Sequence, residues 1–281
     1  MNTLHPLVSI CVPVYNAEPF LEETLKSALA QSYQNWELVI VENQSKDRSR
    51  EIIERFVERA ADPRIRVHIN EIHLGSGALN MNHAIGLARG EFIKILCADD
   101  TIEPDCLAVQ VQSLIDNPGA VMATCCKKII NAKGKLLFRR QGFNRSGFIK
   151  GGDVIKGCFR VGTNLIGEPT LVLLRVSSLE GIELMNPARP YVVDLDLWLR
   201  LMLRGGIVYD RRALGSFRVH GHADTRKLES RMLGDFFDMA DDISRQAGTT
   251  INAWQYRWLK FRIPIQNAVR RLVYRWSSGW K

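Results

Sequence analysis

Two adjacent acids, Asp99 and Asp100, are the residues whose placement most directly suggests chemistry. They follow the apolar run 92–98, which begins after Gly90 and is typical of a buried strand. In open α/β sheets, ligands bind at the carboxyl ends of such strands. Paired carboxylates repel each other unless a cation lies between them, and oxygen ligands suit Mg²⁺ and Mn²⁺. The residues alone equally allow a solvated turn and a helix N-cap before Pro104.

The elements that would position this pair alternate regularly along the first half of the chain. Apolar runs predict strands at 7–14, 36–41, 65–69, 92–98 and 121–124, and apolar residues at helical spacing predict a helix after each of the first four. Such alternation implies βαβ crossovers and a mostly parallel sheet with helices on both faces. The first strand is not followed by G-x-G-x-x-G, and the sequence has no Walker A loop, so neither dinucleotide nor P-loop chemistry is favoured.

The second half of the chain is less regular. Residues 127–167 are rich in glycine and basic residues, and we expect connecting loops that cover a site. Beyond them we expect a short strand at 171–174 and a helix at 191–204 that ends at Gly205-Gly206. Two more short strands are expected at 207–209 and 215–219.

Composition sets broader limits. The chain of 281 residues can form one large domain or a domain with an appendage, and its net charge of +8 suggests an anionic partner such as a nucleotide, a nucleic acid or an acidic membrane. Its six cysteines lack metal-ligand spacing, which indicates a reducing compartment. The N-terminus lacks a signal-peptide pattern and no stretch approaches the roughly 20 apolar residues of a membrane span. We therefore expect a cytoplasmic protein, soluble or peripheral on the inner face of the membrane.

The C-terminal tail differs from the rest. Residues 254–281 contain seven cations, four tryptophans and no acid. This composition suits an interfacial helix on an anionic bilayer. The alternative is a helix packed on the domain with a solvated basic face. A nucleic-acid partner is not expected, because the sequence shows no aromatic-bearing sheet or reading helix.

Four separated segments, taken together, resemble the family 2 glycosyltransferases of the GT-A fold, which are metal-dependent inverting enzymes that use nucleotide-sugar donors. The resemblance covers roughly residues 8–225. The first two motifs are VSICVPVYN at 8–16, similar to the opening strand with a P-x-Y-N turn, and VIVENQSKD at 39–47, similar to V-D-D-x-S-x-D. The third is GEF…LCADD with Pro104, at 90–104, which is similar to the segment that holds the DxD metal motif. The fourth consists of DLDLWLR at 194–200 and FRVH at 217–220, similar to E-D-x-D-L-W-L-R and Y-R-x-H.

The resemblance implies an α/β fold of GT-A type, with a Rossmann-like, mostly parallel sheet flanked by helices. It implies a glycosyltransferase domain at 1–225, with a nucleotide-binding half at about 1–125 and an acceptor-side half at about 126–225. The remaining residues, 226–281, form a helical basic extension that could associate with a membrane.

Residue by residue, the resemblance also implies a nucleotide site. Pro13, Tyr15 and Glu42 match positions that hold the base, and a carboxylate at 42 can accept the imide N–H of uracil or thymine. Ser45 matches a nucleotide-binding position. For both Glu42 and Ser45 the alternative is capping of the next helix, which is more credible for Ser45.

The same resemblance implies a metal site and a catalytic base. Asp99 matches the last acid of DxD, which carries the divalent cation, Mn²⁺ or Mg²⁺, that bridges the donor diphosphate. His220 could add a metal or phosphate contact or be structural, and Asp100 could touch the donor sugar. Asp194 matches the catalytic base, and we expect a helix N-terminus to hold it ionised. Its alternative role is that of an N-cap, whereas Asp196 and Trp198 are assigned to helix stability and the core.

Three positions depart from the family pattern. Cys97 replaces the first acid of DxD, so metal binding would depend on Asp99 and His220. Glu42-Asn43 replaces Asp-Asp, which leaves the base open, and Val193 replaces the Glu before the catalytic Asp.

The predicted function is inverting transfer of a sugar from a UDP- or dTDP-sugar to a hydroxyl of a glycan or lipid-linked glycan, in surface polysaccharide biosynthesis. Because of Cys97 and Val193, a non-catalytic nucleotide-sugar or glycan-binding module is the alternative. A nucleotidyltransferase is disfavoured, since Tyr15-Asn16-Ala17-Glu18 stands where its glycine-rich phosphate loop should be.

Overall fold

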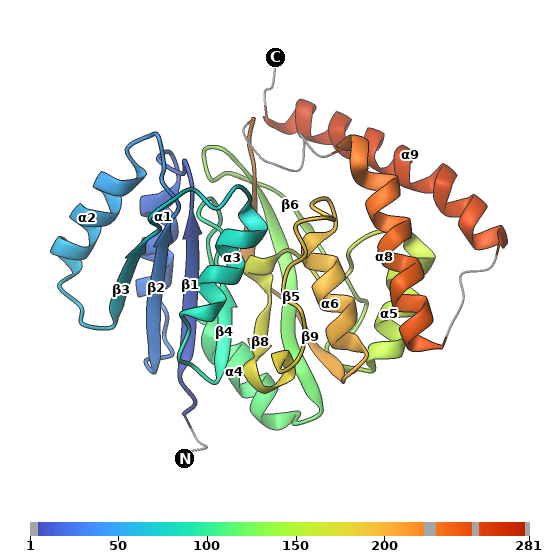
Figure 1. The fold of residues 1–281 in the computed structure, drawn as a ribbon, viewed down its shortest axis with the longest axis horizontal. Helices are drawn as coiled ribbons and strands as arrows, with labels where there is room; N and C mark the ends of the chain where they lie inside the picture. Colours follow the sequence, from blue (N-terminus) through green and yellow to red (C-terminus); the bar gives the residue numbers. More distant parts are fainter. Residues whose placement is uncertain (1–4, 222–228, 249–252, 279–281) are drawn as a thin grey trace.

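The computed structural model describes residues 5–221, 229–248 and 253–278, with side chains of the last helix described as far as Ala268. A twisted central sheet is covered by helices on both faces (Figure 1). Its strands follow the order β3-β2-β1-β4-β8-β5-β9-β7, and β6 pairs with β5.

The N-terminal half is a parallel βαβ arrangement. Its strands are almost continuously apolar, as strands covered on both faces must be. Three helices connect them. These elements are β1 (Val8–Val14), α1 (Leu21–Leu29), β2 (Trp36–Glu42), α2 (Ser49–Ala60), β3 (Ile65–Ile69), α3 (Gly77–Gly86) and β4 (Phe92–Ile95). Because β1, β2 and β4 run in one direction, the residues that follow them meet at one edge of the sheet.

The C-terminal half extends the sheet with mixed pairing. The short β8 is antiparallel to both β4 and β5, whereas the long β9 is parallel to β5. The longest pairings, β1 with β2 and β5 with β9, are parallel, which confirms the predicted mostly parallel α/β class. The elements are α4 (Cys106–Asp116), β5 (Ala120–Asn131), β6 (Leu136–Arg140), β7 (Gly147–Ile149), α5 (Gly151–Val161), β8 (Leu173–Arg175), α6 (Val193–Met202) and β9 (Gly206–Val219).

The expectation of loops at 127–167 is wrong for most of that range. Strand β5 continues to Asn131, and β6, β7 and α5 follow. The continuation of β5 escaped detection because two of its residues are lysines, and each is neutralised by an acid distant in sequence. Lys127 pairs with Glu168, and Lys128 Nζ lies 2.8 Å from Glu103 Oε1. Similarly, the two short strands expected at 207–219 are one strand, β9.

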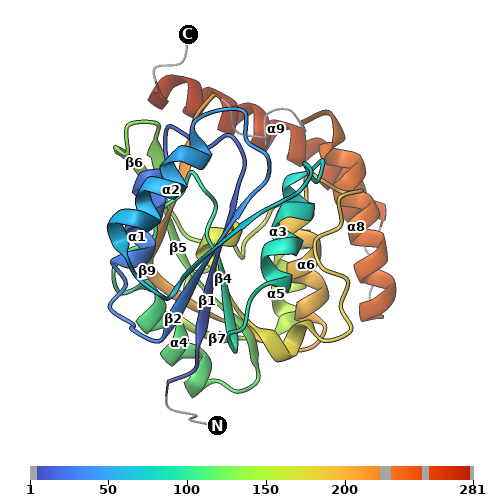
Figure 2. The same cartoon turned by 60° about the vertical axis from the view of Figure 1, so that its left-hand side comes forward.

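Two apolar layers hold the sheet and its helices together. In the view of Figure 2, α1, α2 and α4 lie on one face of the sheet and α3, α5 and α6 on the other. The first layer includes Leu25, Phe56 and Leu107, and the second is centred on the fully buried Trp198. The prediction that Trp198 belongs to the core is confirmed.

Two further helices, α8 (Met232–Ala247) and α9 (Ala253–Ser278), pack over the second layer. The predicted domain boundary at 225 lies outside the described residues. Within the described part of the chain, no helix has the length and apolarity needed to cross a bilayer.

Gly162, which ends α5, is the point where α9 approaches most closely. It has a φ of +66°, and a Cβ there would lie 2.7 Å from Ile263 Cγ1 and 2.8 Å from Leu259 Cδ2. We expect Gly162→Ala to lower the free energy of unfolding by about 2 kcal/mol or more, from left-handed strain plus overpacking. Urea unfolding measures this. Gly152→Ala in the same helix is the control, because a Cβ there meets open space; an equal loss in both variants would contradict the close packing of α9.

Candidate active site

The predicted site residues gather where β1, β2 and β4 end, with β9 joining from the other half of the sheet. Two turns, 15–18 and 43–49, form one side and are tied together by hydrogen bonds. The Asn16 N–H donates to Ser45 Oγ (3.0 Å), and the Lys46 N–H donates back to Asn16 Oδ1 (2.7 Å). Asn16 and Gln44 adopt positive φ values of 50° and 59°. Such strained conformations are kept at sites where geometry is tightly determined.

Glu42 and Ser45 both support these turns. The buried Glu42 carboxylate accepts hydrogen bonds from the Gln44 N–H (3.0 Å) and the Ser45 N–H (2.6 Å). Glu42 therefore holds the turn, and neither Glu42 nor Ser45 caps the next helix, because α2 (Ser49–Ala60) has Arg48 as its N-cap. Each carboxylate oxygen has a second lone pair, so an acceptor for a ligand N–H remains.

Tyr15 and Pro13 lie at the end of β1. Tyr15 is 41% exposed, and its ring centroid lies 4.5 Å from that of His73. Pro13 is half-buried at the register position of Val41. His73, from the segment after β3, was missed by the sequence analysis because its loop carries no motif. Together Tyr15 and His73 offer an exposed aromatic surface next to the two turns.

Asp99 and His220 meet across the site. His220 Nε2 lies 2.9 Å from Asp99 Oδ2, although the two residues are 121 positions apart in the chain. His220 also packs against Phe20, with ring centroids 4.7 Å apart, and its Nδ1 is buried without a hydrogen-bond partner. The structure thus brings together the two residues predicted to bind metal.

A divalent cation fits this donor set. Ligand atoms of Cys97, Asp99 and Asp100 lie within 4.8 Å of one another. Burial and the neighbouring acids raise the pKa of the Cys97 thiol well above its ordinary value, so it is a neutral sulfur and a poor ligand for a hard cation. Asp99 with His220 remains. Mg²⁺ commonly uses only one or two carboxylates and completes its shell with water and substrate phosphates.

The Asp100 carboxylate lies close to Cys97 and Asp99 but is buried and bonded within the fold, and its contact with a donor sugar stays a prediction. Its side chain is 2% exposed, and its oxygens accept from the Arg218 N–H (2.8 Å) and the Thr170 hydroxyl (2.8 Å). Burial and the Asp99 carboxylate raise the pKa of Asp100 well above its ordinary value. Asp100 therefore holds β9 and the segment before β8 against the end of β4.

Arg218 fixes the Asp99 turn from the other side. Its Nε donates to the Asp99 carbonyl (2.6 Å) and its Nη2 to Glu23 Oε2 (2.7 Å), while its guanidinium lies 4.9 Å from the Phe20 ring centroid. The side chain is 1% exposed. The sequence placed Arg218 beside His220 but assigned it no role, and the structure shows that it positions Asp99.

Asp194 lies at the start of α6 in an environment that the sequence did not predict. Its Oδ1 accepts from the Leu195 N–H (2.7 Å) and its Oδ2 from Asn164 Nδ2 (3.0 Å). Burial and then the Glu168 carboxylate raise the pKa of Asp194 to about 6, against the lowering effect of the Leu195 N–H. The helix N-terminus therefore does not lower the pKa of Asp194 overall, although a pKa of about 6 still leaves the carboxyl mostly ionised at neutral pH. Asp194 is also not the N-cap, which is Val192.

Three residues missed by the sequence analysis surround Asp194: Asn164, Glu168 and Lys127. Lys127 pairs with Glu168 and lowers the pKa of that acid, although burial by itself would raise it. Lys127 and Asn164 also line a pocket of about 50 Å³. No pattern in the sequence marks them, because Lys127 comes from β5, whereas Asn164 and Glu168 come from the loop that follows α5. The Cys97 N–H donates to Thr170 Oγ1 (3.1 Å), which joins the segment after Glu168 to the turn that carries Asp99.

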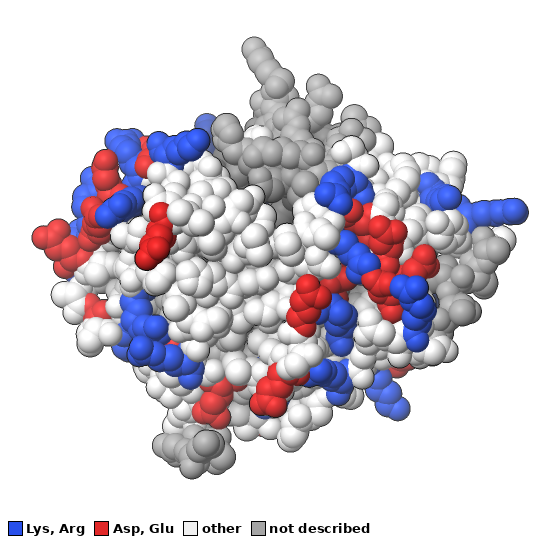
Figure 3. Space-filling model, in the orientation of Figure 1, with Lys and Arg blue, Asp and Glu red and all other residues white. Residues whose placement is uncertain are grey.

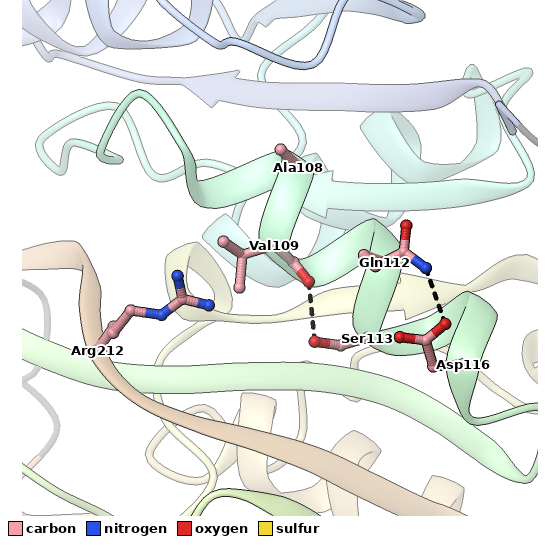
Figure 4. Close-up of a pocket in the computed structure, with 6 residues that line it drawn as sticks. All are labelled: Ala108, Val109, Gln112, Ser113, Asp116 and Arg212. Atoms are coloured by element: carbon pink, nitrogen blue, oxygen red, sulfur yellow. Dashed lines mark hydrogen bonds between the residues drawn. The ribbon is translucent and has the colours of Figure 1, made fainter.

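A larger surface pocket, of about 370 Å³, lies elsewhere (Figure 4). It is lined by one face of α4 and by Arg212. Its polar groups satisfy one another within the helix: the Ser113 hydroxyl donates to the Val109 carbonyl and Gln112 Nε2 to Asp116 Oδ1, each at 2.8 Å. It contains none of the predicted site residues, so we place the chemistry at the strand ends.

Comparison with known proteins shows the family to which the chain belongs. The model of glycosyl transferase family 2 matches residues 9–180. An uncharacterised glycosyltransferase of Rickettsia typhi is 28% identical over 229 residues, which are 78% of this chain and 66% of that protein. A putative teichuronic acid biosynthesis glycosyltransferase of Bacillus subtilis, TuaG, is 29% identical, covering 74% of this chain and 77% of its own length. Some relatives are much longer: the chain spans 37% of one from Rickettsia conorii.

Solved structures show the same fold. Staphylococcus aureus TarS (residues 1–349), in complex with UDP, superposes with a TM-score of 0.64 at 19% identity, covering 90% of this chain and 69% of that one. The mannosyltransferase PcManGT of Pyrobaculum calidifontis, in complex with GDP-Man and Mn²⁺, gives 0.59 at 16% identity, covering 98% and 84%. Both likenesses confirm the predicted GT-A architecture.

The raised pKa of Asp194 predicts a pH-dependent stability. The folded state holds the Asp194 proton more tightly than the unfolded chain does, so the protonated carboxyl favours folding at low pH. This contribution to stability is lost as the pH rises from the ordinary pKa of 3.8 through about 6. We therefore expect the free energy of unfolding of Asp194→Asn, relative to wild type, to rise between pH 4 and pH 7 and then level off. Urea titrations across this range measure the slope, which is insensitive to the hydrogen bond that the variant loses. A flat difference would contradict the assigned environment.

Proposed function

Because the chain belongs to glycosyl transferase family 2, we propose that it transfers a sugar, with inversion, from a UDP- or dTDP-sugar to a hydroxyl of a glycan or lipid-linked glycan. One observation carries the proposal. A partly buried carboxylate of raised pKa, Asp194, faces the same site as the Asp99–His220 pair. The transfer needs a group that accepts the proton of the attacking hydroxyl and a group that stabilises the negative charge of the leaving diphosphate. Asp194 would be the first, and a cation held by Asp99 and His220 would be the second.

The donor side is formed by the two tied turns. Glu42 offers the carboxylate that a uracil or thymine N–H needs, and Tyr15 with His73 offers a surface on which a base can stack. TarS has been crystallised with UDP and with UDP-GlcNAc, which supports a UDP-sugar as the first donor to test. The name of the Bacillus relative supports a role in surface polysaccharide biosynthesis, on the cytoplasmic side where nucleotide sugars are made.

Asp99 and His220 would hold a divalent cation, Mn²⁺ or Mg²⁺. When bound, such a cation supplies Lewis-acid stabilisation to the leaving nucleoside diphosphate. The protein contributes the fixed position of this pair. Arg218 holds the Asp99 backbone, and Phe20 holds the His220 ring. Preorganised groups of this kind cost no reorganisation during the reaction.

Asp194 takes the proton from the attacking hydroxyl. As the acceptor oxygen forms its bond to C1 of the sugar, the C1–O bond to the diphosphate breaks on the opposite face, the electron pair leaves with the diphosphate, and the proton moves to the Asp194 carboxylate. A pKa of about 6 leaves this group mostly ionised at neutral pH and makes it a stronger base than an ordinary aspartate. Asn164 fixes its orientation.

The alternative is a non-catalytic nucleotide-sugar or glycan-binding module. It is favoured by the neutral Cys97 thiol at the first position of the metal motif. Such a module would bind a nucleoside diphosphate with metal but would neither transfer nor hydrolyse any nucleotide sugar. The two experiments below separate it from the enzyme.

Metal-dependent nucleotide binding is expected to require Asp99. At a hundred times its dissociation constant, a ligand raises the free energy of unfolding by about 2.7 kcal/mol. We expect UDP or dTDP with Mn²⁺ to raise the melting temperature of wild type, EDTA to remove much of the shift, and Asp99→Ala to abolish its metal-dependent part. Asp153→Ala, which removes an exposed acid on α5, is the matched control. A shift in Asp99→Ala equal to that of wild type would refute the metal role.

The acid limb of the pH–rate profile is expected near pH 6 because it reports Asp194. Asp194→Asn should lower the transfer rate by about 10²- to 10⁴-fold while UDP binding is retained. Glu168→Gln should move the limb to lower pH, since Glu168 raises the pKa of Asp194 and the freed Lys127 lowers it. Glu180→Gln, an exposed acid, serves as the control and should leave the limb unchanged. Full activity in Asp194→Asn would exclude it as the base, and absent turnover in wild type with intact UDP binding would favour the binding module.

A further inference from the structure

Helix α9 has two apolar faces, and the domain covers one of them. Leu259 and Ile263, four residues apart, are 1% and 3% exposed and contact Gly162 at the end of α5. Tyr256 stacks on Phe237 of α8, with ring centroids 4.1 Å apart. This face explains why α9 lies on the domain.

The opposite face remains in solvent. It carries large apolar side chains spaced four, three and four residues apart, which places them on one side of the helix. We call this set the outer stripe; its members are Trp254, Trp258, Phe261 and Ile265, with exposed fractions of 73%, 43%, 65% and 46%. The two indole rings are stacked 6.3 Å apart. A contiguous exposed apolar patch of this kind marks an interaction surface.

The charges beside the outer stripe define its partner. Arg257 is exposed beside it, and the Arg262 guanidinium lies 6.0 Å from the Trp258 ring centroid. Residues 254–281 hold seven cations and no acid. Elsewhere the charges are mixed: over α2 and over α6 and α8, Lys and Arg alternate with Asp and Glu (Figure 3). Tryptophans combined with cations match the interfacial and anionic headgroup region of a bilayer.

The location of α9 suits such a contact. In both Figure 1 and Figure 2, α9 crosses the end of the molecule opposite the N-terminus, the end toward which β1 runs. The turns of the donor site follow β1 and β2 at that same end. A surface held by α9 would therefore lie on the side of the protein that carries the active site.

We propose that α9 docks the protein on an anionic lipid bilayer, with the outer stripe at headgroup depth and Arg257 and Arg262 against lipid phosphates. The proposal combines the two alternatives from the sequence, since α9 packs on the domain and its solvent face carries apolar as well as basic side chains. The proposal concerns the helix surface and does not depend on which sugar is transferred.

The test is co-sedimentation of the full chain with two kinds of vesicle. One contains phosphatidylcholine alone, and the other also contains about 30% phosphatidylglycerol, which gives the vesicle a negative surface potential. We expect binding to the anionic vesicles with a blue shift of tryptophan fluorescence. The triple variant Trp254→Ala, Trp258→Ala, Phe261→Ala should bind about tenfold more weakly or worse. Phe138→Ala, an exposed aromatic on β6, should bind like wild type.

A second pair of variants isolates the charges. Arg257→Glu with Arg262→Glu should lose binding, whereas Arg50→Glu with Arg55→Glu, at exposed positions on α2, changes the net charge equally and should not. Equal loss in both pairs would overturn specific docking through α9, and so would equal binding to neutral vesicles.

The remaining occupant of the outer stripe is a second copy of the chain. If light scattering shows a wild-type dimer that the triple variant breaks, and wild type does not bind vesicles, the membrane proposal is overturned. UDP binding, measured on the same samples, reports the donor site separately. A failed docking result and a failed transferase result are thus distinguishable.

Discussion

The buried carboxylate of Asp100 is the interaction on which the site depends. Its oxygens accept from Thr170, which precedes β8, and from the backbone of Arg218, near the end of β9. Leaving a buried polar group without a hydrogen-bond partner costs about 1–3 kcal/mol of folding free energy, and more if the group is charged. The turn after β4, the segment before β8 and the end of β9 are therefore held together. The consequence is geometric. Once Arg218 is fixed against the turn after β4, His220 comes to lie beside Asp99, so the pair proposed to bind metal forms from residues at distant positions in the chain.

The base side of the site depends on a different balance. Asp194 is held by Asn164 and the Leu195 N–H, both of which favour its ionised form, but burial and Glu168 outweigh them and raise its pKa. Lys127 forms an ion pair with Glu168 and lowers the pKa of that acid. Its positive charge thereby offsets part of the rise that Glu168 causes in the pKa of Asp194. Trp198 links the arrangement to the core, since its indole N–H donates to the Gly167 carbonyl in the loop that carries Asn164 and Glu168. A residue placed in the core by its apolar pattern therefore also positions the loop around the proposed base.

Helix α9 shows how one amphipathic pattern can serve two surfaces. Its inward residues repeat every four positions and fill the space left by Gly162, whose positive φ and missing Cβ allow the close approach. Its outward residues repeat with the same helical period on the other side. A hydrophobic pattern alone cannot tell these faces apart, because each has the period of a buried stripe. Only the packing against α5 and α8 shows which face is covered.

The sequence by itself determined the fold class, the first four strands with their helices, and the turns that carry Tyr15, Glu42 and Asp99. These follow from local signals: apolar runs, helical spacing and polar residues just after strands. The sequence could not determine the continuation of β5 through Lys127 and Lys128, because their charges are neutralised by Glu168 and Glu103, which lie far away in the chain. Nor could it show that Asp100 turns inward, that His220 meets Asp99, or that Asp194 has a raised pKa. Each of these depends on burial and on partners contributed by other elements, and such quantities exist only once the chain has folded.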